Sequence, residues 1–291
     1  MVEPVICAIN PIAGYESTTS LGASSSGKIA VVGGGPAGME VSRVLAMRGF
    51  SVTLFEEQHR LGGLLNIAAK IPGRGEFAAY VSYMLRELKR LNIQIRIDTL
   101  ATADTIAAGG FDFTICATGT VAGAPPVDGV EMSHVTSAYD AISLGLQDLG
   151  DVVIIGGGAL GCCTAMYLTS QADSVQIVEA DEALGVDLGR TTRWVILKFL
   201  KAKNISTQLL TEVVNIDSKK ITVYQDEKFH HINAKTIILA TRPQPRDRLL
   251  RQLEKKGLKF EKVGSVKRSM NLLDVIHSAY EFANSFELSQ T

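Results

Sequence analysis

Two short apolar runs dominate the pattern of hydrophobic and polar positions along the chain. Residues 28–32 (KIAVV) and 151–155 (DVVII) are almost continuously apolar, which is typical of parallel strands buried on both faces. Each run ends in three glycines, and small or apolar positions follow at helical spacing, as at Ala37, Val41 and Leu45. The pattern therefore predicts a strand, a tight turn and a helix, and predicts this unit twice.

The rest of the chain predicts elements that complete each unit. A second strand should follow each helix, at residues 51–57 and 174–180. The other expected elements are a helix at 76–91, a strand at 93–98, a strand within 111–119, a meander at 205–241 that ends in a strand, and an apolar-faced helix at 270–286. Residues 58–75 are too irregular for a helix. Residues 135–145 are expected to link two domains, and residues 242–247 to form a proline-marked linker.

The two units are copies of one another. Adding 123 to a position carries the three glycines Gly33, Gly35 and Gly38 onto Gly156, Gly158 and Gly161. The same offset carries Glu56 onto Glu179, and residues 114–118 (TICAT) onto 237–241 (IILAT). A single GxGxxG is weak evidence, but two in register, each with an acid 18 residues beyond the last glycine, predict two dinucleotide sites. We call residues 33–38 the first elbow and residues 156–161 the second elbow.

Each glycine spacing has a physical reason. The first glycine allows the sharp turn, the second lets a pyrophosphate approach the backbone, and the third lets helix and strand pack closely. The diphosphate then lies on unpaired N–H groups at the positive end of a helix. The acid at the second strand's tip accepts hydrogen bonds from ribose hydroxyls and repels a 2′-phosphate, so Glu179 favours NADH over NADPH. Arg190 and Arg193 follow closely, however, and a nearby arginine can reverse that preference.

Composition narrows the class of protein. Twenty-nine basic and 30 acidic residues give a net charge of −1, which does not suit a nucleic-acid binder. The chain has no apolar run of about 18 residues and no signal-peptide pattern at its start, so we expect no membrane partner and a cytoplasmic location. Cys116, Cys162 and Cys163 are expected to be buried thiols, because no CxxC pair is present. The five histidines show no metal or triad spacing, so no metal site is predicted.

The sequence resembles the C-terminal half of the iron-sulfur flavoenzymes related to 2,4-dienoyl-CoA reductase and trimethylamine dehydrogenase. The resemblance rests on the stretches CAINPIAGYE (7–16), 28–77, FDFTICATG (111–119), VVIIGGGALGCCTAMYL (152–168) and VIHSAYEFA (275–283). It implies an α/β fold of two Rossmann-like dinucleotide-binding domains, the second inserted into the first. The implied domains are an N-terminal extension at 1–27, a first part of an FAD-binding domain at 28–140, an NAD(P)-binding domain at 141–243, and the C-terminal part of the FAD-binding domain at 244–291.

The same resemblance implies the cofactor-binding residues. Those for FAD are Gly33, Gly35, Pro36, Ala37, Gly38, Glu56, Glu57, Arg60, Gly63, Leu64, Leu65, Thr118 and Gly119, and those for NADH are Gly156, Gly158, Ala159, Leu160, Gly161 and Glu179. In such enzymes an FMN-binding barrel and four cysteines that hold a [4Fe-4S] cluster precede this region. Cys7 matches the last of the four, and the other three are absent from this chain. We therefore expect Cys7 to be a remnant and not a metal site, either in an excised domain or in a naturally short relative.

Two departures keep an alternative function open. Many such flavoproteins carry Gly-Asp near the C-terminus, where the carboxylate holds a ribityl hydroxyl, and here Ser265 replaces the acid. Arg242 stands where the offset expects a copy of Gly119. The leading hypothesis is an oxidoreductase module that passes hydride from NADH to FAD, a step for which no catalytic acid, base or nucleophile is required. The alternative is a non-redox module whose first elbow binds ADP. A small-substrate monooxygenase ranks below both.

Overall fold

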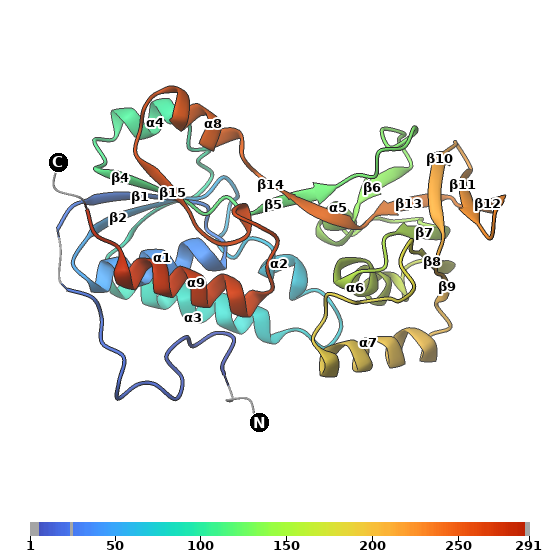
Figure 1. The fold of residues 1–291 in the computed structure, drawn as a ribbon, viewed down its shortest axis with the longest axis horizontal. Helices are drawn as coiled ribbons and strands as arrows, with labels where there is room; N and C mark the ends of the chain where they lie inside the picture. The colour runs from blue at the N-terminus through green and yellow to red at the C-terminus, as the bar shows by residue number, and fades with distance from the viewer. Residues whose placement is uncertain (1–5, 24–25, 289–291) are drawn as a thin grey trace. The chain divides into compact units, whose positions relative to one another are not determined.

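Two five-stranded parallel sheets organise the chain (Figure 1). The computed structural model describes residues 6–23 and 26–288. Among these, residues up to Ala68, Glu76–Val121 and those from Gln244 onward form unit 1, while Ala69–Gly75 and Ala122–Pro243 form unit 2. Unit 2 is thus inserted into unit 1 along the sequence.

The sheet of unit 1 has the strand order β15-β4-β1-β2-β3, and all four pairings are parallel. Its strands are β1 (Lys28–Val32), β2 (Ser51–Phe55), β3 (Gln94–Arg96), β4 (Phe113–Cys116) and β15 (Phe260–Lys262). The central strand β1 is buried from Ile29 to Val32 because helices cover both faces of the sheet. Its continuous apolar sequence therefore matches its position.

Helices cover the two faces of this sheet separately (Figure 1). On one face, α1 (Pro36–Met47), α3 (Glu76–Arg90) and α9 (Leu272–Ser285) pack against alternate strand residues such as Ile29 and Val31. On the other, α4 (Ala103–Ala108) and α8 (Arg248–Lys255) pack against Ala30 and Val32. The short α2 (Leu65–Ala68) lies just beyond β2 along the chain, and a 3-10 turn, η1, spans Gly264–Val266.

Unit 2 repeats this sheet, with the strand order β6-β13-β7-β8-β9 and all pairings parallel. Its strands are β6 (Val135–Ser137), β7 (Asp151–Ile155), β8 (Ser174–Val178), β9 (Ser206–Gln208) and β13 (Thr236–Leu239), and its helices are α5 (Ala138–Leu144), α6 (Ala159–Leu168) and α7 (Arg190–Ala202). An antiparallel sheet of β10 (Glu212–Ile216), β11 (Lys220–Gln225) and β12 (Lys228–Asn233) contributes Ile216, Ile221 and Val223 to the core on one face of the parallel sheet.

The sequence repeat is therefore a repeat of strand positions. Strands β7, β8, β9 and β13 take the places in unit 2 that β1, β2, β3 and β4 take in unit 1. The fifth, edge strand differs, because β6 precedes β7 in the chain whereas β15 follows β4 by more than a hundred residues. The predicted α/β class with two Rossmann-like sheets is confirmed.

Three predicted boundaries differ from the structure. Residues 135–145 were expected to link two domains, but they form β6 and α5 inside unit 2, because β6 pairs with β13. Unit 2 accordingly starts at Ala122 and not at residue 141. The proline-marked stretch at 242–247 is not an open linker either: β14 (Thr241–Pro245) pairs with β5 (Thr120–Gly123) in a two-stranded sheet.

Further elements were missed or misplaced. Helices α2, α4, α7 and α8 were not predicted. Two of them are short, with four residues in α2 and six in α4, so they carry little periodic signal. The meander expected at 205–241 is in fact β10–β12 alone, since β9 pairs parallel with β8.

Arg48 ties three distant segments of unit 1 together. It follows α1, is 3% exposed, and its Nη1 donates to the carbonyl oxygens of Ala283 and Phe286 at 2.7 Å each. Its Nε also donates to the Ala23 carbonyl oxygen at 3.3 Å. A guanidinium can reach several carbonyls at once because its five donors are held in a rigid fork.

We expect Arg48→Ala to lower the free energy of unfolding by roughly 3 kcal/mol, because charge-assisted bonds to three carbonyls are lost and buried carbonyls are left without donors. Arg48→Lys should recover part of this loss. The measurement is urea denaturation. Arg90→Ala is the matched control, since Arg90 pairs with Glu87 at the surface and its loss should leave the midpoint nearly unchanged. Equal effects of the two alanine variants would contradict this role for Arg48.

Candidate functional site

The first elbow brings the N-terminus of α1 to the end of β1. Gly33 has a φ of +109°, and its N–H donates to the Phe55 carbonyl at 2.8 Å. A Cβ on Gly38 would lie 1.8 Å from the Gly33 carbonyl oxygen, so only glycine fits there. By contrast, a Cβ on Gly35 would meet nothing within 4 Å. The middle glycine therefore faces open space at the start of the helix.

The second elbow has the same geometry. Gly156 has a φ of +108°, and its N–H donates to the Val178 carbonyl at 2.9 Å. A Cβ on Gly161 would lie 1.8 Å from the Gly156 carbonyl oxygen, as at the first elbow. Gly158 is extended and precedes α6, just as Gly35 precedes α1. The repeat in sequence is thus a repeat in backbone conformation.

The predicted acids lie against the glycine turns. Glu56 is 7% exposed, and its two carboxylate oxygens accept hydrogen bonds from the N–H groups of Gly34 (2.7 Å) and Gln58 (2.8 Å). Glu179 accepts from the N–H groups of Gly157 and Asp181 in the same way. These bonds hold each carboxylate in place at the strand tip, and each oxygen keeps a lone pair for a further donor.

The glycine pair after β2 folds back onto the first elbow. The Gly62 N–H donates to the Gly34 carbonyl at 2.8 Å, and a Cβ on Gly63 would lie 3.1 Å from the Gly35 Cα. Leu64 is exposed beside this turn, whereas Leu65 is buried in the core. Of the predicted residues in this stretch, Gly63 therefore lies against the elbow, Leu64 is open to solvent, and Leu65 belongs to the core of unit 1.

Arg246 joins three of the predicted residues at the carboxyl end of β4. Its carbonyl accepts from the Thr118 hydroxyl at 2.8 Å, its N–H donates to the Gly119 carbonyl at 3.0 Å, and its guanidinium pairs with Glu57. Sequence reasoning missed Arg246, which had been assigned to a linker. Arg60, in contrast, is exposed and makes no hydrogen bond or ion pair with the residues that the structure describes.

The 3-10 turn near the C-terminus also reaches the first elbow. Gly264 has a φ of +73°, and a Cβ there would lie 2.7 Å from the Ala37 Cβ. Ser265, the residue that replaces an expected acid, therefore stands next to the first turn of α1. Its half-buried hydroxyl offers a neutral hydrogen-bonding group at this position.

The N-termini of α1 and α6 differ in whether a side chain accepts from their free N–H groups. Helix α1 has proline at its first position and no acidic residue in its first turn, and no side chain in the described part of the chain accepts from its N-terminal N–H groups. At α6, the Ala159 N–H donates to the Asp187 carboxylate at 2.7 Å. Sequence reasoning missed Asp187. Applying the offset of 123 to Leu64 would have pointed to it.

These features fit the cofactors that the sequence implies. At the first elbow, orphan N–H groups at the positive end of a helix lie beside a glycine whose missing Cβ leaves open space. That combination suits a diphosphate, which carries negative charge and needs donors at close range. The second elbow offers the same backbone, with the Asp187 carboxylate bonded to one of its donors.

The cysteines behave as core residues. Cys116, Cys162 and Cys163 are free and buried, as predicted. Burial raises the pKa of the Cys116 and Cys162 thiols to about 12, and it raises the pKa of the Cys163 thiol as well. All three are therefore protonated at neutral pH and are poor nucleophiles.

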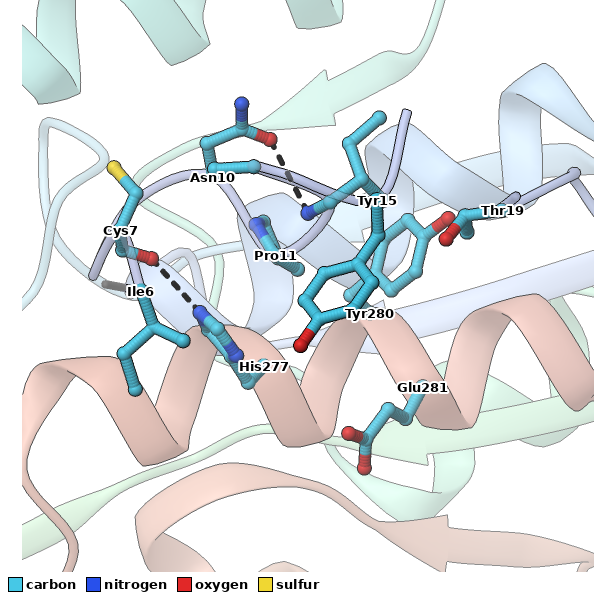
Figure 2. A pocket seen from close by; sticks show the side chains of 11 residues that line it. Ile6, Cys7, Asn10, Pro11, Tyr15, Thr19, His277, Tyr280 and Glu281 are labelled. Atoms are coloured by element: carbon cyan, nitrogen blue, oxygen red, sulfur yellow. Dashed lines mark hydrogen bonds between the residues drawn. The ribbon is translucent and has the colours of Figure 1, made fainter. Parts of the chain in front are cut away.

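Cys7 lines a separate pocket of unit 1 (Figure 2). The pocket has a volume of about 340 Å³ and lies between the N-terminal segment and α9. The Cys7 carbonyl oxygen is 2.8 Å from His277 Nε2, and the thiol points away from that ring. Within residues 6–23 and 26–288, no three metal-binding side chains of the His, Cys, Asp or Glu type come together. No helix in the same ranges is long and apolar enough to cross a bilayer.

Fold and elbows together define a protein with two dinucleotide-binding units. The chain belongs to the pyridine nucleotide-disulphide oxidoreductase family, whose model matches residues 27–273. Membership of this family implies sites for FAD and NAD(P)H.

Individual relatives narrow the position of the chain within this family. It is 32% identical to an NADH oxidase of Thermoanaerobacter brockii over 95% of this chain and 44% of the relative. It is 31% identical to a bilirubin reductase of Mediterraneibacter gnavus over 96% of this chain and 44% of the relative. Among solved structures, it is similar to a 2-naphthoyl-CoA reductase in complex with 2-naphthoyl-CoA, with a TM-score of 0.90, 26% identity, and coverage of 96% of this chain and 43% of that one.

These matches confirm the predicted relationship to the dienoyl-CoA reductase and trimethylamine dehydrogenase group. The chain spans about half the length of the curated relatives it matches. The fold alone also corresponds to thioredoxin reductase of T. acidophilum, with a TM-score of 0.67 and 16% identity over 89% of this chain and 96% of that one.

The glycines of the first elbow should tolerate substitution very differently. Gly38→Ala should lower the free energy of unfolding of the nucleotide-free protein by more than about 2 kcal/mol, because its Cβ collides with backbone that cannot move without separating β1 from α1. Gly35→Ala should cost less than about 1 kcal/mol, since its Cβ enters open space and only the helix cap preference changes. Thermal and urea unfolding measure both, and equal losses would contradict the geometry.

Proposed function

We propose that the chain is a module that passes hydride from NADH, bound at the second elbow, to FAD, bound at the first. The observation that supports this most strongly is the pair of elbows with matched backbone conformation, each with an acid at the tip of the following strand. A single elbow would serve a simple nucleotide-binding protein, whereas two suit a donor and an acceptor of the same hydride.

At the first elbow, the N–H groups of Gly35, Ala37 and Gly38 would receive the FAD diphosphate. Pro36 has no N–H to offer, but its fixed φ suits the first position of the helix. Glu56 would accept from the ribose hydroxyls through the lone pairs left over from its bonds to the glycine turn. Gly63 lies beside Gly35, and the exposed Leu64 follows it, so both would border the cofactor.

Three further residues predicted to bind FAD, Glu57, Thr118 and Gly119, would act on the cofactor less directly than the elbow. Arg246 holds all three, so we propose that this cluster shapes the edge of the FAD site at the end of β4 and leaves contact with the cofactor to the backbone of Thr118 and Gly119. Arg60 is exposed and would reach the cofactor only from the rim of the site.

The diphosphate of the pyridine nucleotide would lie at the second elbow, held by Gly156, Gly158, Ala159, Leu160 and Gly161. Glu179 would bind its ribose hydroxyls and repel a 2′-phosphate, so we propose a preference for NADH over NADPH. The neighbouring Arg193 supports this choice, because its Nε donates to the Leu184 carbonyl at 2.8 Å and part of its guanidinium is thereby engaged.

When bound, FAD and NADH supply the hydride chemistry themselves, and the chain's task is to hold them, orient them and exclude water. The buried thiols cannot relay electrons as a redox-active dithiol, so electrons would leave to an external acceptor or to a partner domain. We propose that this partner carries FMN and an iron-sulfur cluster, since the chain spans only about half of its relatives and Cys7 matches one cluster ligand. Free thiols support a reducing, cytoplasmic location.

A second candidate function rests on Ser265. Because a neutral hydroxyl stands where many such flavoproteins place a ribityl-binding carboxylate, the first elbow would bind ADP and the module would be structural. This alternative keeps the diphosphate site unchanged, so the elbow geometry alone does not distinguish it from the first proposal.

The absorbance spectrum of the purified chain, before and after anaerobic NADH, tests the proposal. We expect flavin bands near roughly 370 and 450 nm that bleach on addition, because an FAD-bound first elbow would accept hydride from the second. At equal concentration, NADPH should bleach them more slowly. A colourless protein that releases ADP on denaturation would contradict the redox function and support the structural alternative.

Two matched variants assign the elbows. Gly35→Ala should purify with less flavin, and Gly158→Ala should keep its flavin but respond to NADH only at higher concentration, because each added Cβ enters the space of one diphosphate. Neither Cβ meets a protein atom closer than 3.4 Å, so both variants should fold. Loss of flavin from Gly158→Ala would instead reverse the assignment.

A further inference from the structure

Asp187 occupies the anion-binding end of helix α6. Its Oδ1 accepts from the Ala159 N–H at 2.7 Å, and both its carboxylate oxygens lie 3.4 Å from the position of a Cβ on Gly158. A dinucleotide diphosphate that approached the second elbow over Gly158 would therefore meet this carboxylate. Two anions cannot share the same few N–H donors, because each repels the other at short range.

The first elbow provides an internal comparison. In unit 1 the Gly62 N–H donates to the Gly34 carbonyl at 2.8 Å, and in unit 2 the Gly185 N–H donates to the Gly157 carbonyl at 2.8 Å. Each turn is then closed by the residue three positions on, Leu65 onto Gly62 at 3.1 Å and Leu188 onto Gly185 at 3.0 Å. The two turns thus share these hydrogen bonds, although their dihedral angles differ: φ is +119° at Gly62 and +60° at Gly185.

The side chain at the equivalent position in each turn is different. The offset of 123 that relates all these pairs carries Leu64 onto Asp187. Unit 1 therefore has an uncharged side chain where unit 2 has a carboxylate, and the N-terminus of α1 accordingly has no carboxylate bonded to it among the described residues. The two elbows share one backbone design but differ in whether the protein supplies its own anion.

The exposure of Asp187 determines whether its hydrogen bond to the Ala159 N–H can break. Asp187 lies at the surface, so its side chain can rotate into water without breaking any packing. Leaving the helix end costs it one charge-assisted hydrogen bond and its interaction with the helix dipole. The contact is therefore strong enough to form and weak enough to be displaced by a doubly charged ligand.

We propose that Asp187 is a displaceable cap that competes with the pyridine-nucleotide diphosphate and keeps binding at the second elbow weak and reversible. The inference rests on the proposed assignment of this elbow to NAD(P)H. The first elbow lacks such a competitor, which suits a cofactor that stays bound, whereas a hydride donor must leave after each reaction.

Calorimetric titration of the FAD-loaded protein with NAD⁺ and with NADP⁺ tests this, since the oxidised nucleotides bind without transferring hydride. Asp187→Leu, which installs the side chain of the first elbow, should lower the Kd for NAD⁺ by about fivefold or more, the change that corresponds to loss of a capping bond. It should lower the Kd for NADP⁺ by the same factor, because the diphosphate is common to both. Asp187→Asn keeps an accepting oxygen without the charge and should give a smaller gain.

The variant should also lose thermal stability without nucleotide and regain more of it when NAD⁺ is added than the wild type does. A merely structural cap would lower the stability and leave the affinity unchanged or weaker. If the wild type binds NAD⁺ and neither variant binds it more tightly, the displaceable cap is wrong and the site assignment stands. If neither wild type nor variants bind NAD⁺, the assignment fails, and the cap proposal fails with it.

The reverse substitution completes the test at the first elbow. Leu64→Asp places a carboxylate at the equivalent position of the turn, so it should lower the ratio of FAD to protein after purification. An unchanged ratio would show that a carboxylate at this position does not compete with a diphosphate, and would overturn the proposal.

Discussion

The contact between a helical glycine and the carbonyl of the first glycine in the same turn determines the geometry of both units. At Gly38 and at Gly161 a Cβ would lie 1.8 Å from that carbonyl oxygen, which no larger residue can accommodate. This closeness fixes the distance between strand and helix and brings the helix N-terminus to the carboxyl end of the sheet. The N–H groups at the start of the helix, the acid at the tip of the next strand and the returning glycine turn are all arranged around this one approach.

The duplication also shows how one backbone can serve two purposes. Both elbows hold a strand-tip glutamate through two N–H groups, and both are covered by a turn closed with the same hydrogen bonds. Among their differences is the residue that follows the glycine turn, which is Leu64 in unit 1 and Asp187, bonded to the helix end, in unit 2. In this account the fold supplies the diphosphate site twice, and local charge decides how firmly each copy holds its ligand.

A feature of the fold or the site could be predicted from the sequence when the residues that form it lie close together along the chain. The strands, elbows and glutamates were predicted because each depends on neighbours within about 30 residues and on a repeat that checks itself. Arg246 could not be found in this way, because its ion pair with Glu57 spans 189 residues and only the folded sheet brings the two together. Residues 135–145 were misread for a similar reason, since β6 becomes a strand only by pairing with β13, a hundred residues later.

The central claim, that hydride passes from a nucleotide at one elbow to FAD at the other, is tested most directly by an isotope measurement. The purified chain would be mixed anaerobically with NADH that carries deuterium at the transferred position of nicotinamide C4, and the bleaching of the flavin would be followed in a stopped-flow instrument. The account predicts slower bleaching with deuterated than with ordinary NADH, and deuterium absent from the NAD⁺ produced. Bleaching that leaves the deuterium on the nicotinamide, or no bleaching with either donor, would contradict it.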